Sequence, residues 1–435
     1  MQAGFSMLEA GAVSNKNVIN ILYKNIMDAS LAGIFFWAFG WSVAYGPTAG
    51  GFMGTGVPFL MDIDNNSKGW ESWFFQWAFA GTAATIVSGS VAERTKFHAY
   101  LIYSALCATF IYPVVVHWGW GSGFLSAWGA NPDAAGEARP LLTGTSASNG
   151  MIDFAGSGIV HMVGGVSGLV GAIIVGPRTG RFIDGKLQSM PGHSVMNQAL
   201  GTIILWFGWY GFNCGSTLGL SGGLGAVAGK VAITTTLSAT SSCLTSTVLS
   251  LIFDRAFDIG IALNGILAGL VGITANCSIV DPWHAVVIGL VSAIVYYGAR
   301  RLLFVLKIDD PLDAFPIHGA AGFWGLLASG IFCTDANVQF AGYPNVNTAC
   351  ASGEQFAVQL IGGLVIFVWS FVMSGAVFLA LKLTIGLRVT SEVELAGLDV
   401  SEHGLAFFAD PAKPPAADAL PAVAVAANKV APEAP

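Results

Sequence analysis

Apolar residues in this chain gather into long runs that short polar stretches interrupt. A bilayer core needs about 20 apolar residues per helix. Ten runs are long enough, and they lie near residues 18–46, 70–92, 97–120, 152–176, 195–215, 225–252, 258–276, 282–299, 314–333 and 355–384. Residues 1–11, "MQAGFSMLEAG", have the character of the second half of one more span. The pattern therefore predicts an all-α polytopic membrane protein with eleven transmembrane helices, the first apparently truncated or begun at an internal Met.

Composition agrees with this prediction and excludes other classes. The chain has 435 residues, of which 54% are hydrophobic and only 10% are charged, whereas a soluble domain carries about 25% charged residues. Its 56 glycines fit close packing between membrane helices. The sequence holds no basic run for nucleic acid, no Cys/His cluster with metal spacing, and no phosphate loop or nucleophile triad. We therefore expect no nucleic-acid partner, no metal site, no cofactor and no enzymatic activity.

Lysine and arginine in the loops predict the orientation. With an external amino terminus and eleven spans, the cytoplasmic loops hold ten of these residues and the external loops hold two, Lys68 and Arg139. This asymmetry places the carboxyl terminus in the cytoplasm. In the external loop after the tenth span, Cys333 and Cys350 lie close enough in sequence for a disulfide, although two free thiols remain an alternative.

The chain after the last span divides into two parts. Residues 386–409 begin with "GLRVTSEVELAGLDVSEHG", which is polar with mixed charge and predicts an ordered cytoplasmic segment. Residues 410–435 are rich in Ala and Pro, which predicts disorder. The expected organisation is therefore a transmembrane domain over 1–385, followed by these two segments.

One spacing recurs between two apolar spans. Asp153 precedes His161 by eight residues, Asp310 precedes His318 by eight, and glycines follow both histidines. The two histidines fall on the fifth and tenth spans. Five spans per half would give the halves opposite topology, as in inverted-repeat transporters whose sites lie at the repeat interface. We therefore expect an inverted five-plus-five repeat.

Two interpretations apply to histidines inside apolar spans. Each is either a packing residue with satisfied hydrogen bonds or part of a polar pathway, since ionisable groups in a bilayer are costly and mark function. Equivalent depths of His161 and His318 in related helices favour the pathway. Two neutral imidazoles can hydrogen-bond to each other and relay a proton.

Aromatic residues gather at the predicted external ends of several spans. Phe75 and Phe79 are four residues apart on one helix face, Trp120 closes the fourth span, and "WFGWYGFNCGS" (206–216) ends the sixth. Such a cluster can bind a cation through its π faces. The alternative is the interfacial aromatic belt of membrane proteins, which accounts for many tryptophans at this depth.

The acidic residues near the spans are expected to have structural roles. Asp153 begins the fifth span, where a carboxylate caps the helix and makes the vestibule negative. Lys24 and Asp28, four apart, predict a buried ion pair. Asp309, Asp310 and Asp313 precede the tenth span and, like Asp153, are predicted to be capping acids.

Several stretches together resemble the ammonium transporter (Amt/Mep/Rh) family, and within it the Amt branch. They run from residue 1 to about 405: "MQAGFSMLEAG", "NKNVINILYKN", "FFQWAFAG", "SGSVAERTKF", "HWGWGSG", "DFAGSGIVHMVGG", "GWYGFNCGS", "GILAGLVGIT", "DDPLDAFPIHGAAGFWG" and "LRVTSEVELAGLDVSEHG". The resemblance implies a homotrimer in the plasma membrane, with one pore per subunit, eleven helices and an inverted repeat.

The resemblance also implies roles at the external mouth. Phe75, Trp120 and Ser216 match the family's recruitment site for ammonium, and Phe79 and Phe212 match the two-phenylalanine gate beneath it. A π cage with a hydroxyl acceptor can hold a tetrahedral hydrogen-bond donor.

Deeper in the span, the resemblance implies a pore. His161 and His318 match the twin histidines, Asp153 the aspartate beside the vestibule, and Thr274 a residue near the pore. An apolar, dry pore disfavours charge, so ammonium would lose its proton and NH₃ would pass along the imidazole edges. K⁺ has no proton to lose and would stop at the gate. Whether the proton also crosses stays open.

Two other functions are compatible with the same fold. A membrane sensor would report ammonium through its tail, although only about 50 residues follow the last span, too few for a fused kinase or cyclase. An Rh-like gas channel is the third interpretation, and the presence of Trp120 with the two phenylalanines favours the Amt branch over it.

Overall fold

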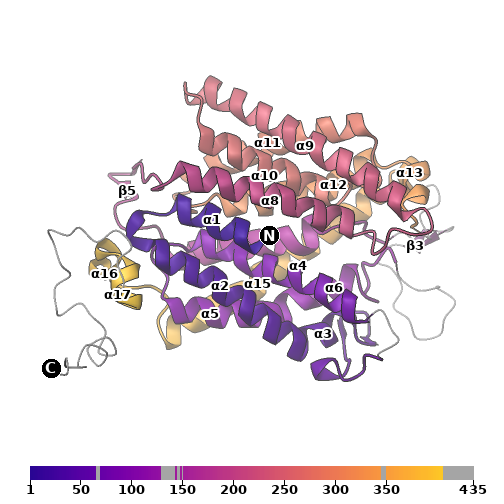
Figure 1. Ribbon diagram of the computed structural model, residues 1–435, viewed down its shortest axis with the longest axis horizontal. Coiled ribbons are helices and arrows are strands. Elements are labelled where there is room, and N and C mark those ends of the chain that lie inside the picture. The colour runs from indigo at the N-terminus through magenta and orange to yellow at the C-terminus, as the bar shows by residue number, and fades with distance from the viewer. Residues whose placement is uncertain (65–68, 129–142, 145–146, 149, 344–348, 405–435) are drawn as a thin grey trace, which may run out of the picture.

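The protein is a bundle of long helices that run side by side along its longest axis (Figure 1). The structure is a computed structural model that describes residues 1–64, 69–128, 143–144, 147–148, 150–343 and 349–404. The boundary between the tail segments, expected near residue 410, lies outside these residues.

Every one of the eleven expected spans is helical. They are α1 (Gln2–Ala12); η1, α2, η2 and α3 (Asn15–Asn17, Val18–Phe35, Phe36–Gly40, Trp41–Tyr45); α4 (Gly69–Ser90); α5, η4 and α6 (Phe97–Leu106, Cys107–Ile111, Tyr112–Gly119); η5 and α7 (Ser157–Met162, Val163–Val175); α8 (Val195–Gly215); α9 (Leu224–Phe253); α10 (Ile259–Thr274); α11 (Pro282–Val305); η6 and α12 (Phe315–Ala320, Ala321–Phe332); and α15 (Glu354–Thr384). Within the described ranges, seven continuous helical segments are long and apolar enough to cross a membrane. The predicted all-α polytopic fold is confirmed.

Short elements connect the long helices. They are the helices η3 (Pro58–Leu60), α13 (Asp335–Phe340), α14 (Ala349–Ser352), α16 (Ser391–Ala396) and α17 (Leu398–His403), and three two-stranded antiparallel ribbons: β1 with β2 (Thr48–Ala49, Met53–Gly54), β3 with β4 (Thr143–Gly144, Ala147–Ser148), and β5 with β6 (Phe182–Ile183, Lys186–Leu187). In Figure 1, α16, α17 and β5 lie at one end of the bundle, and α13 and β3 lie at the other.

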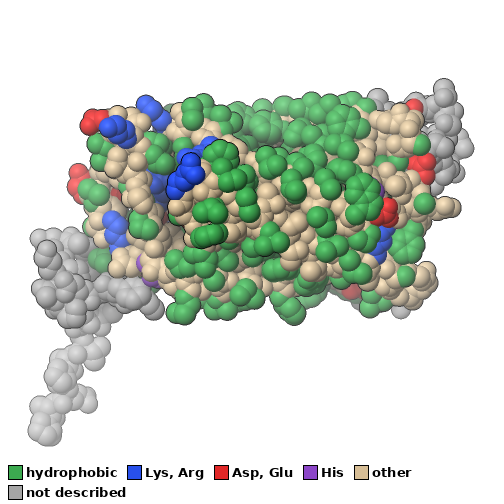
Figure 2. Space-filling model, turned by 90° about the horizontal axis from the view of Figure 1, so that it is seen from above, with side chains coloured by type: hydrophobic (Ala, Val, Ile, Leu, Met, Phe, Trp, Pro, Cys, Tyr) green, Lys and Arg blue, Asp and Glu red, His purple; other side chains and the backbone are tan. Residues whose placement is uncertain are grey.

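The surface is divided in the way a bilayer requires. Figure 2 shows hydrophobic side chains over the middle of the bundle and most of the charged side chains toward its two ends. One face of α8 illustrates the middle region, because Met196, Ile203 and Phe207 are 79%, 61% and 78% exposed. A soluble protein would bury such side chains, whereas lipid or a neighbouring subunit covers them in a membrane.

Glycine and serine allow the closest helix contacts. A Cβ at Gly269 of α10 would lie 2.5 Å from the Cβ of Ser242 in α9. The Ser238 hydroxyl also donates a hydrogen bond of 2.7 Å to the Gly269 carbonyl. Small residues at such positions let helix backbones approach, which explains part of the high glycine content.

The two helices that carry the central histidines cross each other at glycine. Each begins with a π-helical segment, η5 or η6, and continues as α7 or α12. A side chain at Gly165 would collide with the backbone of Gly319. The glycines that follow His161 and His318 therefore permit the crossing that brings the two histidines together.

The expected ion pair of Lys24 with Asp28 is wrong. The Lys24 ammonium donates to the Thr95 carbonyl at 3.1 Å. Asp28 instead accepts hydrogen bonds from the Tyr100 hydroxyl at 2.7 Å and the Gln2 amide at 2.8 Å. The reason is that each side chain finds a partner on another segment, so the spacing of four residues does not decide their pairing.

Of the three acids before the tenth span, only Asp310 caps η6, by accepting the Phe315 amide at 2.7 Å. Asp313 pairs with Arg300 of α11 at 3.0 Å. Asp309 pairs with Arg178 at 2.8 Å. The capping prediction is therefore wrong for Asp309 and Asp313, because arginines from distant loops compete for these carboxylates.

Arg178 forms the centre of a buried ionic cluster at the α16 end of the bundle. Its guanidinium contacts both Asp309 and Glu93, and the Arg94 guanidinium donates to the Asp309 carbonyl at 2.7 Å. Burial opposes ionisation of Glu93 and Asp309, but the positive charge and hydrogen bonds of Arg178 prevail and lower both pKa values to about 2. The cluster joins the loops after α4, α7 and α11.

The segment after α15 folds back onto this end. The Asp399 carboxylate accepts the backbone amides of Ile19 and Asn20 at 3.1 and 2.8 Å. Glu402 accepts the Phe97 amide at 3.1 Å. Because orphan amides at a helix start favour carboxylates, α17 caps α2 and α5. Residues 386–404 are thus docked on the same chain.

Cys333 and Cys350 form a disulfide at the opposite end, with an S–S distance of 2.07 Å. The bridge closes a loop that includes α13. Of the two alternatives for these cysteines, the structure therefore has the disulfide.

Candidate functional site

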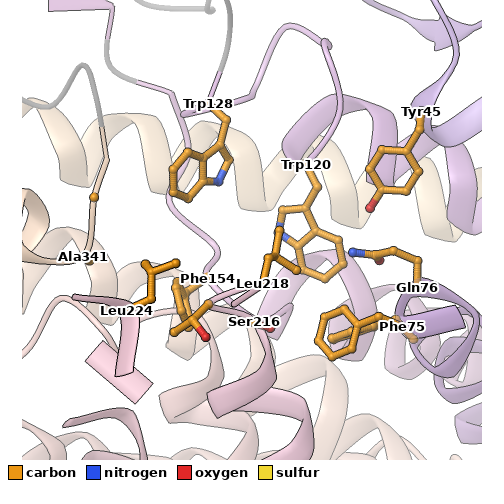
Figure 3. Close-up of a pocket in the computed structure, with 13 residues that line it drawn as sticks. Tyr45, Phe75, Gln76, Trp120, Trp128, Phe154, Ser216, Leu218, Leu224 and Ala341 are labelled. Atoms are coloured by element: carbon orange, nitrogen blue, oxygen red, sulfur yellow. The ribbon is translucent and has the colours of Figure 1, made fainter. Parts of the chain in front are cut away.

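A cavity of about 310 Å³ opens at the α13 end of the bundle (Figure 3). Phe75 and Phe79 of α4, Trp120 after α6, and Ser216 after α8 all line it. The structure thus brings together, in one cavity, residues from three helices that the sequence placed in an external mouth.

Aromatic contacts connect these residues. The Trp120 ring meets the Phe79 ring edge-on at 5.3 Å, and Phe75 meets Phe79 edge-on at 4.8 Å between centroids. The Ser216 hydroxyl donates to the Phe212 carbonyl at 2.8 Å, which leaves its oxygen lone pairs for another donor. The wall can offer both π faces and a hydroxyl acceptor to a small cation.

Two phenylalanine rings lie at the inner end of the cavity. The ring centroids of Phe79 and Phe212 are 3.9 Å apart, and the two side chains are 1% and 3% exposed. Phe212 lies next to His161 on its other side, at 5.8 Å. The pair therefore separates the cavity from the histidines.

His161 and His318 are buried and contact each other. Their Nδ1 atoms are 3.2 Å apart, within hydrogen-bond range. One ring must donate and the other accept if both are neutral. The Nε2 atom of His161 has no hydrogen-bond partner among the described residues. A buried polar atom without a partner is costly, so this nitrogen is available to a ligand.

Trp209 of α8 holds one side of His161. The two rings stack with centroids 4.9 Å apart and an interplanar angle of 15°. The Trp209 indole donates to the Thr274 hydroxyl at 2.9 Å, and Thr274 donates to the Leu270 carbonyl at 2.7 Å. Thr274 thus lies behind Trp209 and positions it. On the other histidine, the Phe5 ring of α1 packs near His318 with ring centroids 6.0 Å apart.

Asp153 lies behind the site and does not line the cavity. Its carboxylate accepts the backbone amides of Gly156, Ser157, Gly158 and Ile159 at 2.8–3.1 Å. Gly156 has φ +103°, a value that favours glycine. The Asp153 carbonyl also accepts the Trp120 indole N–H at 2.6 Å. Asp153 therefore caps η5, as the sequence predicts, and positions Trp120.

The cavity includes residues that the sequence did not predict. Gln76 and Tyr45 line it, and the Gln76 carbonyl oxygen and the Tyr45 hydroxyl have no hydrogen-bond partner within the described part of the chain. Trp128 and Phe154 line its other side. Trp209, which stacks on His161, could have been predicted, because it precedes Phe212 of α8 by three residues and Ser216 by seven, both helical spacings. Tyr45 ends α3 and Trp128 lies in the segment after α6, positions that no spacing in the sequence signals.

Among the described residues, no group of three or more His, Cys, Asp or Glu side chains is arranged to hold a metal ion.

Known proteins resemble this chain over almost its entire length. The sequence profile of the Ammonium Transporter Family matches residues 1–408. The chain is 40% identical over 406 residues to ammonium transporter Amt2 of Archaeoglobus fulgidus, an alignment that covers 93% of this chain and 84% of the relative. It is 43% identical over 412 residues to ammonium transporter 1 member 1 of Oryza sativa subsp. japonica, covering 92% and 80%.

Solved structures of Amt and Mep proteins also resemble this chain. A structure titled "Sensor Amt Protein" superposes with a TM-score of 0.80 at 34% identity and covers 92% of this chain and 94% of its own. Saccharomyces cerevisiae Mep2 gives a TM-score of 0.78 at 27% identity, covering 90% and 84%. The chain therefore belongs to the Ammonium Transporter Family, a family of multi-pass membrane transporters.

Proposed function

We propose that this protein carries ammonium across the plasma membrane by binding NH₄⁺ in the aromatic cavity, removing its proton and conducting NH₃ past the twin histidines. The observation that carries the proposal is a continuous series of side-chain contacts. It runs from the cavity through the rings of Phe79 and Phe212 to the twin histidines, His161 and His318.

The cavity suits the charged form. Phe75, Phe79 and Trp120 present π faces, which attract a cation. Ser216 and the free carbonyl oxygen of Gln76 add hydrogen-bond acceptors. A tetrahedral donor can satisfy both requirements at once.

The gate suits only the neutral form. Taking a charge out of water into an apolar passage costs far more than taking a neutral, hydrogen-bonding molecule. The closely packed rings of Phe79 and Phe212 impose this cost. Ammonium lowers it by giving its proton to water at the open end of the cavity, so that neutral NH₃ enters, and K⁺ has no proton to give.

Beyond the gate, the two histidines can form hydrogen bonds with the passing molecule. NH₃ is a donor and an acceptor, and the unpartnered Nε2 of His161 can pair with it. The contact of 3.2 Å between the two Nδ1 atoms offers a route by which a proton can follow. Trp209 stacks on His161 and keeps its edge toward the passage.

The orientation and assembly are part of the proposal. The cavity end, toward which the amino-terminal end of α1 points, would face outward, and the Arg178 cluster with the docked tail would face the cytoplasm, in line with the loop charges. The exposed apolar faces described for α8 support contact with lipid and with two further copies in a homotrimer.

A second candidate function is ammonium sensing, because a structure titled "Sensor Amt Protein" is among the similar ones. A pure sensor would bind ammonium without net flux.

Transport by purified protein in liposomes separates the two functions. We expect saturable uptake driven by an ammonium gradient, weaker uptake of methylammonium, and none of K⁺. Ammonium binding without uptake would favour the sensor, and equal uptake of K⁺ would contradict the proposed gate.

A further inference from the structure

Trp128 lines the same cavity but belongs to neither the recruitment residues nor the gate. Figure 3 shows it on the far side of the cavity from Phe75, beyond Trp120. We propose that Trp128 forms an outer aromatic subsite for ammonium-type cations, and that the disulfide-closed loop from Cys333 to Cys350 positions it through Tyr343. The inference rests on the proposed function and extends its binding site outward.

The Trp128 ring has one covered face and one open face. It stacks on Tyr343 with centroids 4.3 Å apart and an interplanar angle of 26°. Tyr343 is only 6% exposed, whereas Trp128 is 43% exposed. The free face borders the cavity, and a cation is attracted to such a face within about 6 Å of the ring centroid.

The backbone before Trp128 is fixed. The Trp128 amide donates to the Ser126 hydroxyl at 3.2 Å. Ser126 forms a parallel bridge with Met151, whose amide donates to the Leu125 carbonyl at 2.7 Å. Hydrogen bonds therefore fix the backbone that carries the Trp128 indole, and Tyr343 is needed only to set the orientation of the ring.

Tyr343 is fixed by the loop on the other side. Its amide donates to the Val338 carbonyl at 3.3 Å at the end of α13. Asn337 ties α13 to two long helices, because it accepts a hydrogen bond from Lys230 at 2.7 Å and donates one to Asp281 at 2.9 Å. The disulfide joins both ends of the loop. Tyr343, attached to α13 in this way, thus supports the Trp128 ring.

The chemistry of this part of the cavity favours weakly hydrated cations. Near Trp128 the lining includes the apolar residues Phe154, Leu218, Leu224 and Ala341 and the hydroxyl of Thr217, and none of the described lining residues is a carboxylate. Attraction must come from the aromatic faces, which bind ammonium and its methylated derivatives. A strongly hydrated cation gains little from such a wall because it has to lose its water first.

The test measures the concentration dependence of ammonium and methylammonium transport in liposomes. Trp128→Leu should raise the half-saturating concentration about two- to fivefold, as expected for a half-exposed cation–π contact, with an unchanged maximal rate. Trp128→Phe, which keeps a π face, should restore most of the affinity. Trp70→Leu is the matched control, since Trp70 is 46% exposed and lies outside the cavity lining.

The positioning of Trp128 by Tyr343 and the disulfide-closed loop is tested with the same assay. Tyr343→Leu and the double change C333S/C350S should each raise the half-saturating concentration, and Tyr343→Phe should not. Neither change should add to the effect of Trp128→Leu, because both act through the indole. Additive effects would overturn the positioning role of the loop.

Comparison with Trp120→Leu separates a failure of the outer subsite from a failure of the proposed function. A raised half-saturating concentration in Trp120→Leu with an unchanged one in Trp128→Leu would overturn the outer subsite and leave the proposed function intact. If neither substitution changes the concentration dependence, the aromatic recruitment site itself fails. Wild-type maximal rates confirm that each variant is folded.

Discussion

The Nδ1 atoms of His161 and His318 lie 3.2 Å apart although the residues are separated by 157 positions in the chain. Two features produce this contact. Asp153 and Asp310 accept backbone amides at the starts of η5 and η6, and Gly165 meets Gly319 where the helices cross. The pair is therefore a product of two similar helix beginnings and one close crossing.

The crossing predicts a steric effect on stability. Gly165→Ala should destabilise the protein by about 1–3 kcal/mol, because the new methyl group would collide with the Gly319 backbone. Thermal unfolding in detergent measures the loss. Gly298→Ala in α11 is the control, since a Cβ there has nothing within 4 Å. Equal midpoints for the two variants would contradict the tight crossing.

The aromatic cavity predicts that Trp120 contributes to the binding of ammonium. Trp120→Leu should weaken ammonium recruitment by about 0.5–2 kcal/mol, or roughly two- to thirtyfold in half-saturating concentration. Trp120→Phe keeps the π face but loses the hydrogen bond to the Asp153 carbonyl, so a smaller loss is expected. Uptake kinetics provide the measurement. Trp283→Leu is the control, because Trp283 is 62% exposed and lies outside the cavity lining; its uptake kinetics should match those of the wild type. If Trp120→Leu also shows wild-type kinetics, Trp120 belongs to the interfacial aromatic belt.

The ionic cluster predicts a loss of stability in acid. The pKa values of Glu93 and Asp309 are lowered to about 2 from 4.5 and 3.8. Their ionised forms stabilise the fold fully above about pH 4.5, and this contribution is lost as the pH falls toward 2. Thermal unfolding between pH 7 and pH 3 should show the decline.

Glu93→Gln tests the source of that decline. It should cost about 3–5 kcal/mol at pH 7, as expected when a buried pair loses one partner, and should flatten the pH dependence. Asp254→Asn removes the more exposed pair with Arg301 and should cost less than about 1 kcal/mol. An unchanged acid profile in Glu93→Gln would place the titrating groups elsewhere.

The docked tail predicts different effects at two hydroxyls. Ser401 donates to the Gly397 carbonyl at 2.8 Å within α17, next to the acids that cap α2 and α5. A negative charge at Ser401 would compete with those acids, so Ser401→Asp should expose the tail to protease and lower transport. Thr390 is the N-cap of α16, a position where Asp is favoured, and Thr390→Asp should leave the tail docked. Full transport by a variant lacking residues 386–435 would show that transport does not depend on the docked tail.

The fold was predictable because it depends on a signal that the sequence carries directly. Runs of apolar residues locate the spans, and the equal spacing of aspartate and histidine locates the two histidines that meet in the bundle. Aromatic spacing along α4 and α8 likewise places Phe75, Phe79 and Phe212 on the faces that meet.

The errors and omissions share a physical cause. Helical spacing predicts a pair of Lys24 with Asp28, but the two side chains bond to Thr95 and Tyr100 on other segments. The position of Asp309 predicts a cap, but it pairs with Arg178, 131 residues away. Trp128 reaches the cavity only through the loop fold. Contacts between distant segments decide all of these cases, and local pattern does not report them.

The most direct test of the account is the ratio of K⁺ to ammonium flux through purified protein in liposomes, compared between wild type and His318→Glu. The wild-type protein should transport ammonium and exclude K⁺, because only a species that can lose its proton passes the gate and the paired imidazoles. A carboxylate in place of one ring breaks the neutral pair, so His318→Glu should either raise the flux ratio toward K⁺ or abolish ammonium transport. The same rate and the same ratio in both proteins would contradict a mechanism that depends on His161 and His318.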